Sequence, residues 1–219
     1  GVASGASFGA ALFIMLGFHL IPTTNYQLAL TTNAILFAFI PTIAIIAISK
    51  KKSITPTTMI LAGVAIMYVF RASTSLMTLS ADPEAVEQLY MWNVGTVAQD
   101  SWDNVPMIVA ATTICSVLLF HFAKDITIMT AGDKSAKSMG VNTKVVRVIC
   151  LALMAILTAL IVGVTGTIGF MGLVAPHVAR MFVGSNMKYL LPASAAFGSL
   201  ILVCCDLVTK TLVTGLPVG

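Results

Sequence analysis

The residue with the clearest potential for chemistry is Arg71, a cation about midway along an apolar stretch. A charge at that depth of a lipid bilayer costs at least about 2.5 kcal/mol, so the side chain should face a cavity or a partner. It could line a path for an anionic substrate. Alternatively, it could form a buried ion pair or contact backbone carbonyls, and the residues around it favour neither role over the other.

A second pair of charged residues lies near the end of the chain. Asp206 precedes Lys210 by four residues, which is the favourable order for an ion pair on a helix. Lys210 lies near the outer end of its apolar stretch, where a lysine side chain can extend to the membrane boundary. On these residues alone, a local salt bridge is favoured over a role in docking a partner.

The three histidines do not indicate a metal site. His177 follows Pro176, and neither it nor His19 or His121 has a second histidine, cysteine or carboxylate in a ligand pattern. Hydrogen bonding at span ends is the favoured role. The sequence also contains no Walker motif, nucleophile elbow or zinc-binding helix motif. We therefore expect no catalytic residue, no metal and no cofactor bound by this chain.

The composition is that of an integral membrane protein. The 219 residues are 58% hydrophobic and 9% charged, with a mean hydropathy of +0.99. A soluble domain has about 25% charged residues. Short strands of alternating polarity are absent, which argues against an outer-membrane barrel. The net charge of +4 comes from basic residues between the apolar runs, so it does not indicate nucleic-acid binding.

The apolar runs predict an all-α, polytopic bundle with about seven transmembrane helices, each near the roughly 20 residues that a bilayer core requires. The expected spans cover residues 2–20, 27–49, 56–80, 105–123, 145–165, 167–184 and 189–213. Polar connectors are expected at about 81–104, with a short helix over 83–90, and at about 124–144. We expect residues 1–219 to form a single transmembrane domain.

The distribution of charge orients this bundle. Lysines at 50–52 and several basic residues in the 124–144 connector alternate with the acidic 81–104 connector. The positive-inside rule then makes the 124–144 connector cytoplasmic and the 81–104 connector external. The expected location is the cell membrane, with multiple passes.

A glycine-rich segment precedes and enters the sixth expected span. Glycine at every third position lets helices approach closely in a membrane, whereas a soluble helix would lose about 1 kcal/mol at each one. The glycines of this segment are Gly163, Gly166, Gly169 and Gly172. The segment ends near the cytoplasmic face with Pro176, His177 and Arg180, which we expect to be structural or gating elements.

The cytoplasmic connector contains a short helix pattern. Gly132 and Asp133 indicate a turn into a helix, and Gly140 indicates its end. One side of this helix would present Ala136 and Met139 to a groove on a partner. An ordinary solvated connector is an equally good account of these residues alone.

Motifs along essentially the whole chain resemble the permease subunits of FecCD-type ABC importers for iron-siderophores, haem and cobalamin. They occur in the order of that family: Leu61-Ala-Gly63, Ala81-Asp-Pro-Glu84, Trp92-Asn-Val-Gly95, Ser101-Trp102, Ala131-Gly132 to Val141, Ile168 to His177, Leu190-Leu-Pro192, Asp206 and Leu216-Pro-Val-Gly219.

The resemblance implies a type II ABC importer permease with ten helices, of which this chain would hold the third to the ninth. The first two helices and the last would be missing. The permease would work by alternating access as a homodimer, with two ATPase subunits that bind ATP and magnesium and with an external binding protein. The chain would then be a transporter subunit and no enzyme. Which chelate it carries is left open.

The resemblance also implies roles for particular residues. The ATPase-coupling helix would comprise Gly132, Ser135, Ala136, Met139 and Gly140, and the cytoplasmic gate would include Thr55, Thr57 and Thr58. Lys210 matches a basic position that meets acidic residues on the binding protein. Arg71 departs from the small or polar residue usual there.

An ion-coupled secondary transporter is the alternative function, but such a protein should carry paired carboxylates within the membrane.

Overall fold

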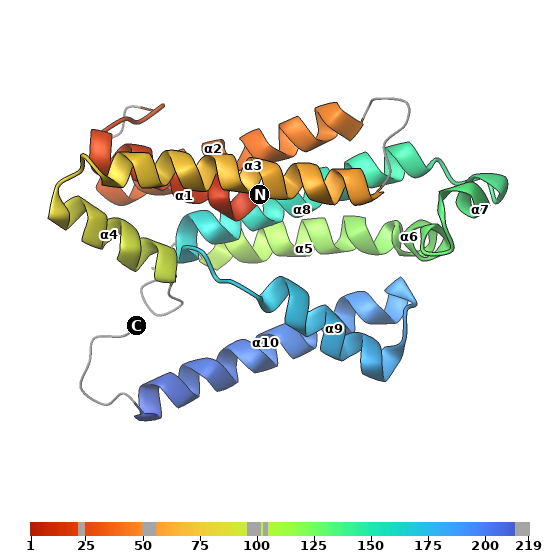
Figure 1. Ribbon diagram of the computed structural model, residues 1–219. Coiled ribbons are helices and arrows are strands. Elements are labelled where there is room, and N and C mark those ends of the chain that lie inside the picture. Colours follow the sequence, from red (N-terminus) through yellow and green to blue (C-terminus); the bar gives the residue numbers. More distant parts are fainter. Residues whose placement is uncertain (22–24, 50–55, 96–101, 103–104, 213–219) are drawn as a thin grey trace. The chain divides into compact units, whose positions relative to one another are not determined.

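The computed structural model describes residues 1–21, 25–49, 56–95, 102 and 105–212. All regular structure in these residues is helical (Figure 1). The helices are α1 (Val2–Leu16), α2 (Tyr26–Ser49), α3 (Pro56–Thr78), α4 (Pro83–Val94), α5 (Val105–His121), α6 (Ala123–Met129), α7 (Asp133–Ser138), α8 (Thr143–Thr165), α9 (Met171–Val183) and α10 (Met187–Leu212). The all-α prediction is therefore confirmed.

Each of the seven predicted spans has a helix at its place, but fewer of them are long enough to cross a bilayer. In the described residues, α2, α3, α8 and α10 qualify by length and composition, and α5 with α6 forms a possible fifth span bent by 55°. Helices α1 and α9 are apolar but shorter. The chain is thus a membrane protein with four or five full-length spans by this measure.

Left-handed residues explain why α1 and α9 are short. Gly17, with φ of 65°, ends α1 four residues before the predicted end, and its N–H bonds back to the carbonyl of Phe13. At the other site, Gly166 and Phe170 have positive φ values of 74° and 63°, so α9 begins only at Met171. All three residues interrupt the helical backbone within stretches that are largely apolar in sequence.

The chain divides into two compact units, which we describe separately. The first unit comprises residues 1–115 and 147–168, and the second comprises residues 116–146 and 169–219. The single transmembrane domain expected from the sequence stays a prediction.

Small residues form the core of the first unit. Ala6 of α1, Ala34 and Ala38 of α2 and Ala159 of α8 are fully buried together. Helix α1 lies against α2 so closely that a β-carbon added at Gly5 would come within 2.7 Å of the carbonyl oxygen of Phe37. Small side chains let the helix backbones approach, which is how helices associate without a hydrophobic drive from the solvent.

A buried amide also connects α1 with α2. The side-chain nitrogen of Asn33 donates to the carbonyl of Gly9 at 2.8 Å and to the carbonyl of Phe18 at 3.1 Å. Asn33 is 1% exposed. It therefore fixes the middle of α1, and Phe18 just after this helix, against α2.

In the second unit, α9 and α10 pack along each other, with the rings of Phe182 and Phe197 stacked at a centroid distance of 5.3 Å. Helix α6 contacts both α7 and α10 (Figure 1). This unit therefore joins the 124–144 connector to the last described helix.

Candidate functional site

The connector after α5 contains the predicted short helix. Gly132 has a φ of 102° and precedes α7, and Gly140 has a φ of 85° just after it. The N–H of Val141 bonds to the carbonyl of Ala136 at 3.0 Å, and the N–H of Gly140 bonds to that of Lys137 at 3.0 Å. This bonding pattern terminates a helix at a left-handed glycine, as the sequence predicted.

The structure corrects one residue of the predicted contact surface. Ala136 is fully buried within the chain, so it cannot be presented to a partner. Met139 is 65% exposed, and Ser135 is also exposed. Because Ala136 lies on the inner side of a helix of only six residues, it positions α7 and leaves Met139 as the apolar side chain that faces outward.

A contact that the sequence did not indicate holds the connector in place. The hydroxyl oxygen of Thr127 in α6 accepts a hydrogen bond from the backbone N–H of Met187 at 3.0 Å. Met187 begins α10, and the first N–H groups of a helix have no partner within the helix. Thr127 therefore caps α10 from 60 residues away in the sequence and ties α6 to it.

The glycine-rich segment packs closely in its first part. A β-carbon at Gly163 would lie 2.6 Å from Cγ1 of Ile35, and one at Gly166 would clash with the carbonyl oxygen of Trp92. At Gly169 and Gly172 no described atom lies within 4 Å of such a carbon. The close-packing prediction is thus confirmed for Gly163 and Gly166, and for Gly169 and Gly172 it stays a prediction.

The partner of Gly166 is the end of α4, which the sequence analysis did not connect with this segment. A β-carbon at Gly95 would lie 3.1 Å from the carbonyl oxygen of Thr165. The hydroxyl of Thr167 donates to the carbonyl of Asn93 at 2.5 Å, and Ser7 donates to the side-chain oxygen of Asn93 at 2.6 Å. The Trp92-Asn-Val-Gly95 motif was the available signal for this junction.

The remaining motif residues lie together on α9. A shallow groove of about 170 Å³ is lined by Gly172, Leu173, Pro176, His177 and Arg180. His177 and Arg180 are exposed. The structural or gating role of these residues stays a prediction.

The predicted pathway residues belong to α3. Thr57, Thr58 and Arg71 are exposed in the isolated chain, and Thr55 lies outside the described residues. Among the residues that the structure describes, no hydrogen bond or ion pair involves the guanidinium of Arg71. The buried ion pair considered for Arg71 is therefore not found within this part of the chain.

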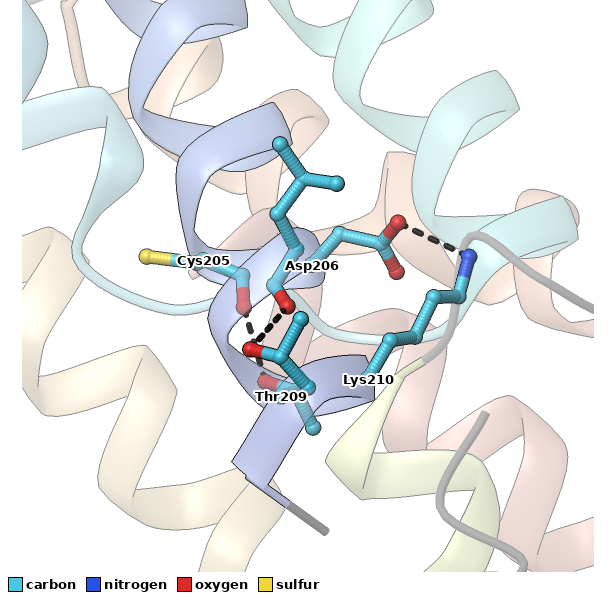
Figure 2. Close-up of polar contacts among 6 residues, drawn as sticks. Cys205, Asp206, Thr209 and Lys210 are labelled. Atoms are coloured by element: carbon cyan, nitrogen blue, oxygen red, sulfur yellow. Dashed lines mark hydrogen bonds and ion pairs between the residues drawn. The ribbon is translucent and has the colours of Figure 1, made fainter. Parts of the chain in front are cut away.

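Figure 2 shows the ion pair near the end of α10. Nζ of Lys210 lies 2.8 Å from Oδ2 of Asp206, and the two side chains are 56% and 45% exposed. The hydroxyl of Thr209 donates to the carbonyl of Cys205 at 2.8 Å. The local salt bridge that the spacing predicts is thus confirmed, and the docking role of Lys210 stays a prediction.

The comparisons with known proteins agree on one family. The model of the FecCD transport family matches residues 1–219. The chain is 33% identical over 220 residues to the cobalamin import system permease protein of Halobacterium salinarum, covering 100% of this chain and 58% of that protein. It is 33% identical over 227 residues to the hemin transport system permease protein of Yersinia pestis, covering 100% of this chain and 66% of that protein.

A solved structure has the same fold. It is described as an inward-facing conformation of a transporter assigned to the metal-chelate type of ABC transporter, and it matches with a TM-score of 0.86 and 30% identity. The match covers 97% of this chain and 66% of that chain. The present chain therefore spans roughly three fifths to two thirds of the length of the relatives it matches.

Proposed function

Because this chain belongs to the FecCD transport family, we propose that it is the membrane-spanning part of an ABC importer permease that takes up an iron-siderophore, haem, cobalamin or a related metal chelate. The relatives named above carry cobalamin and hemin in their names. The protein would lie in the cell membrane, and it would move its substrate by alternating access.

The observation that carries this proposal is the attachment of the α6–α7 connector to α10. An ATPase can drive a permease only if movement at the contact surface reaches the spans. Met139 provides an exposed apolar side chain beside α7, and the Thr127–Met187 hydrogen bond joins α6 to the first residue of a full-length span. A solvated connector without function would not need to be tied to a helix in this way.

The proposed complex contains two copies of this permease, two ATPase subunits and an external binding protein. Gly132, Ser135, Met139 and Gly140 would shape or form the contact with the ATPase, and ATP and magnesium would bind to that subunit. Thr55, Thr57 and Thr58 would belong to the cytoplasmic gate. Lys210 would meet acidic residues of the binding protein at the external face.

The alternative function, an ion-coupled secondary transporter, receives less support. Among the four described helices that qualify as spans on their own, Asp206 is the only carboxylate, and it is already paired with Lys210. A transporter driven by an ion gradient should carry a carboxylate within the membrane that is available to bind the ion.

The test is uptake into vesicles that contain the full-length permease, its ATPase and its binding protein. We expect accumulation that requires ATP hydrolysis and the binding protein and that continues when ion gradients are dissipated. An ATPase variant that binds but does not hydrolyse ATP is the matched control. Accumulation that survives in this control and stops when the gradient collapses would establish the alternative.

A further inference from the structure

Helix α9 turns one side toward α10 and leaves the other side uncovered by the described residues of its unit. Ala175 and Ala179 are buried, and a β-carbon added at Gly198 of α10 would lie 3.5 Å from that of Ala175. Each residue advances by about 100° around a helix, so His177 and Arg180 lie on the side away from these alanines. Both side chains line the shallow groove on α9.

Three residues form a stripe along this side, which we call the α9 stripe: Leu173, His177 and Arg180. Their spacing of four and three residues makes successive side chains neighbours on the surface of the helix. All three are exposed in the second unit. Among the residues that the structure describes, no hydrogen bond or ion pair involves the side chain of His177 or Arg180. The stripe therefore offers N–H donors at one end and an apolar surface at the other.

The polar end of the α9 stripe lies near a boundary of the bilayer. Met187 begins α10, which is long and apolar enough to span a membrane, and residues 184–186 alone separate it from α9. Arg180 lies three residues before the end of α9, which is about 5 Å along the helix axis, and Leu173 lies about 10 Å farther from that end. Tyr189, exposed in the first turn of α10, is a residue type that is enriched at membrane interfaces.

The charge at this boundary favours an anionic ligand. Residues 170–205 contain Arg180 and Lys188 but no aspartate or glutamate. The hydrogen bond between Thr127 and Met187 places the connector of residues 124–144 at the same boundary, and this connector has four lysines against two aspartates. By the positive-inside rule we expect this side to be cytoplasmic, and the cytoplasmic leaflet carries a negative surface potential from its anionic lipids.

We propose that the α9 stripe binds an anionic phospholipid of the cytoplasmic leaflet, with Arg180 and His177 donating hydrogen bonds to its phosphate and Leu173 contacting an acyl chain. A guanidinium group can donate two parallel hydrogen bonds to a phosphate, and an imidazole N–H adds another donor. Leu173 and Met181 are 73% and 78% exposed, so apolar surface adjoins the cation. This surface favours a lipid over a soluble anion. The inference goes beyond the importer function, because it does not depend on what is transported.

The first test compares two lipids on the full-length permease–ATPase complex. Vesicles of phosphatidylcholine receive a small fraction of a lipid with a diazirine in one acyl chain, and after irradiation the peptides that carry lipid adducts are identified by mass spectrometry. Diazirine-labelled phosphatidylglycerol, which is anionic, should label α9 about fivefold more than phosphatidylcholine with the same chain. Equal labelling of α9 by the two lipids would overturn the proposal.

The second test assigns the binding to the α9 stripe. Arg180→Gln should lower the labelling of α9 by phosphatidylglycerol about fivefold. Lys188→Gln is the matched control, because Lys188 is an exposed cation at the same boundary but does not line the groove. We expect little change there, and an equal loss in both variants would show that the lipid responds only to the general surface charge. His177→Gln should also lower the labelling, and it provides the comparison if Arg180→Gln does not assemble with the ATPase.

Two further measurements separate the lipid from other ligands of the groove. Excess inorganic phosphate should leave the labelling unchanged, and a complete loss would assign the groove to a soluble anion. Labelling that appears only after the ATPase has been removed would assign the α9 stripe to a protein contact. Either result would overturn the lipid assignment. Uptake that requires ATP hydrolysis, measured in the same vesicles, would still support the importer function.

Discussion

The hydroxyl group of Thr127 and the backbone N–H of Met187 are joined by a hydrogen bond of 3.0 Å, although 60 residues separate them in the sequence. The same hydroxyl donates to the carbonyl of Ala123 at 2.8 Å, so the side chain is held in the orientation that the cap requires. This bond attaches α6 to the start of α10, and we expect a displacement of α6 and α7 to be transmitted through it.

Thr127→Val should weaken this connection. The first N–H group of α10 would lose its partner, and the loss of a helix cap costs about 1 kcal/mol. We expect a lower thermal unfolding temperature and a lower ratio of substrate transported to ATP hydrolysed. Thr127→Ser retains the hydroxyl and should behave like the original protein. A normal transport ratio in Thr127→Val would contradict the proposed transmission.

The effect of a substitution at Gly140 should depend on whether the new residue can adopt a left-handed backbone conformation, and not on the size of its side chain. Its φ of 85° is strained for most residues, yet no described atom lies within 4 Å of an added β-carbon. Gly140→Val should therefore reduce the amount of ATPase that copurifies with the permease while membrane insertion continues. Gly140→Asn should largely preserve assembly, because asparagine adopts left-handed conformations more readily than other residues. Equal assembly of the two variants would argue against this account.

The two parts of the glycine-rich segment should respond in opposite ways to alanine. At Gly163 the new β-carbon would overlap Ile35, so Gly163→Ala should destabilise the protein by about 1–3 kcal/mol. At Gly172 the carbon meets nothing described, and alanine is the better helix former by about 1 kcal/mol. Thermal unfolding of both variants in detergent provides the comparison. A destabilised Gly172→Ala would show that α9 packs on a further surface.

Asn33 should be important for stability rather than for transport chemistry. Asn33→Leu has a similar volume but leaves the carbonyls of Gly9 and Phe18 without their shared donor, at a cost of about 2 kcal/mol. Thr113→Val is a suitable control, because the exposed hydroxyl of Thr113 bonds only to the carbonyl of Val109 in its own helix. We expect thermal unfolding to separate these variants by several degrees, and similar unfolding temperatures would contradict the role of Asn33.

The docking role of Lys210 can be separated from its local ion pair. Exposed pairs contribute about 0–1 kcal/mol, so neither Lys210→Ala nor Asp206→Asn should change the unfolding temperature appreciably. Lys210→Ala should weaken binding of the external binding protein by about tenfold, whereas Asp206→Asn leaves the cation in place and should preserve binding. Equal affinities for the two variants in a direct binding assay would limit Lys210 to the local pair.

Several elements of the fold could be predicted from the sequence because they depend on local properties. The length of an apolar run determines whether a helix can span a bilayer, and this identified α2, α3, α8 and α10 within a few residues. The spacing of Asp206 and Lys210 predicted their ion pair, and Gly132 and Gly140 predicted the bounds of α7, because both features lie within a few turns of one helix.

The sequence determined that this chain is a helical membrane protein of the FecCD type with a short helix in its 124–144 connector. Only the tertiary structure decided that Ala136 is buried, that Gly163 and Gly166 pack closely, and that Thr127 caps α10. The physical reason is distance along the chain. Helix formation depends on neighbours within a few residues, whereas burial and capping depend on partners that folding brings from elsewhere.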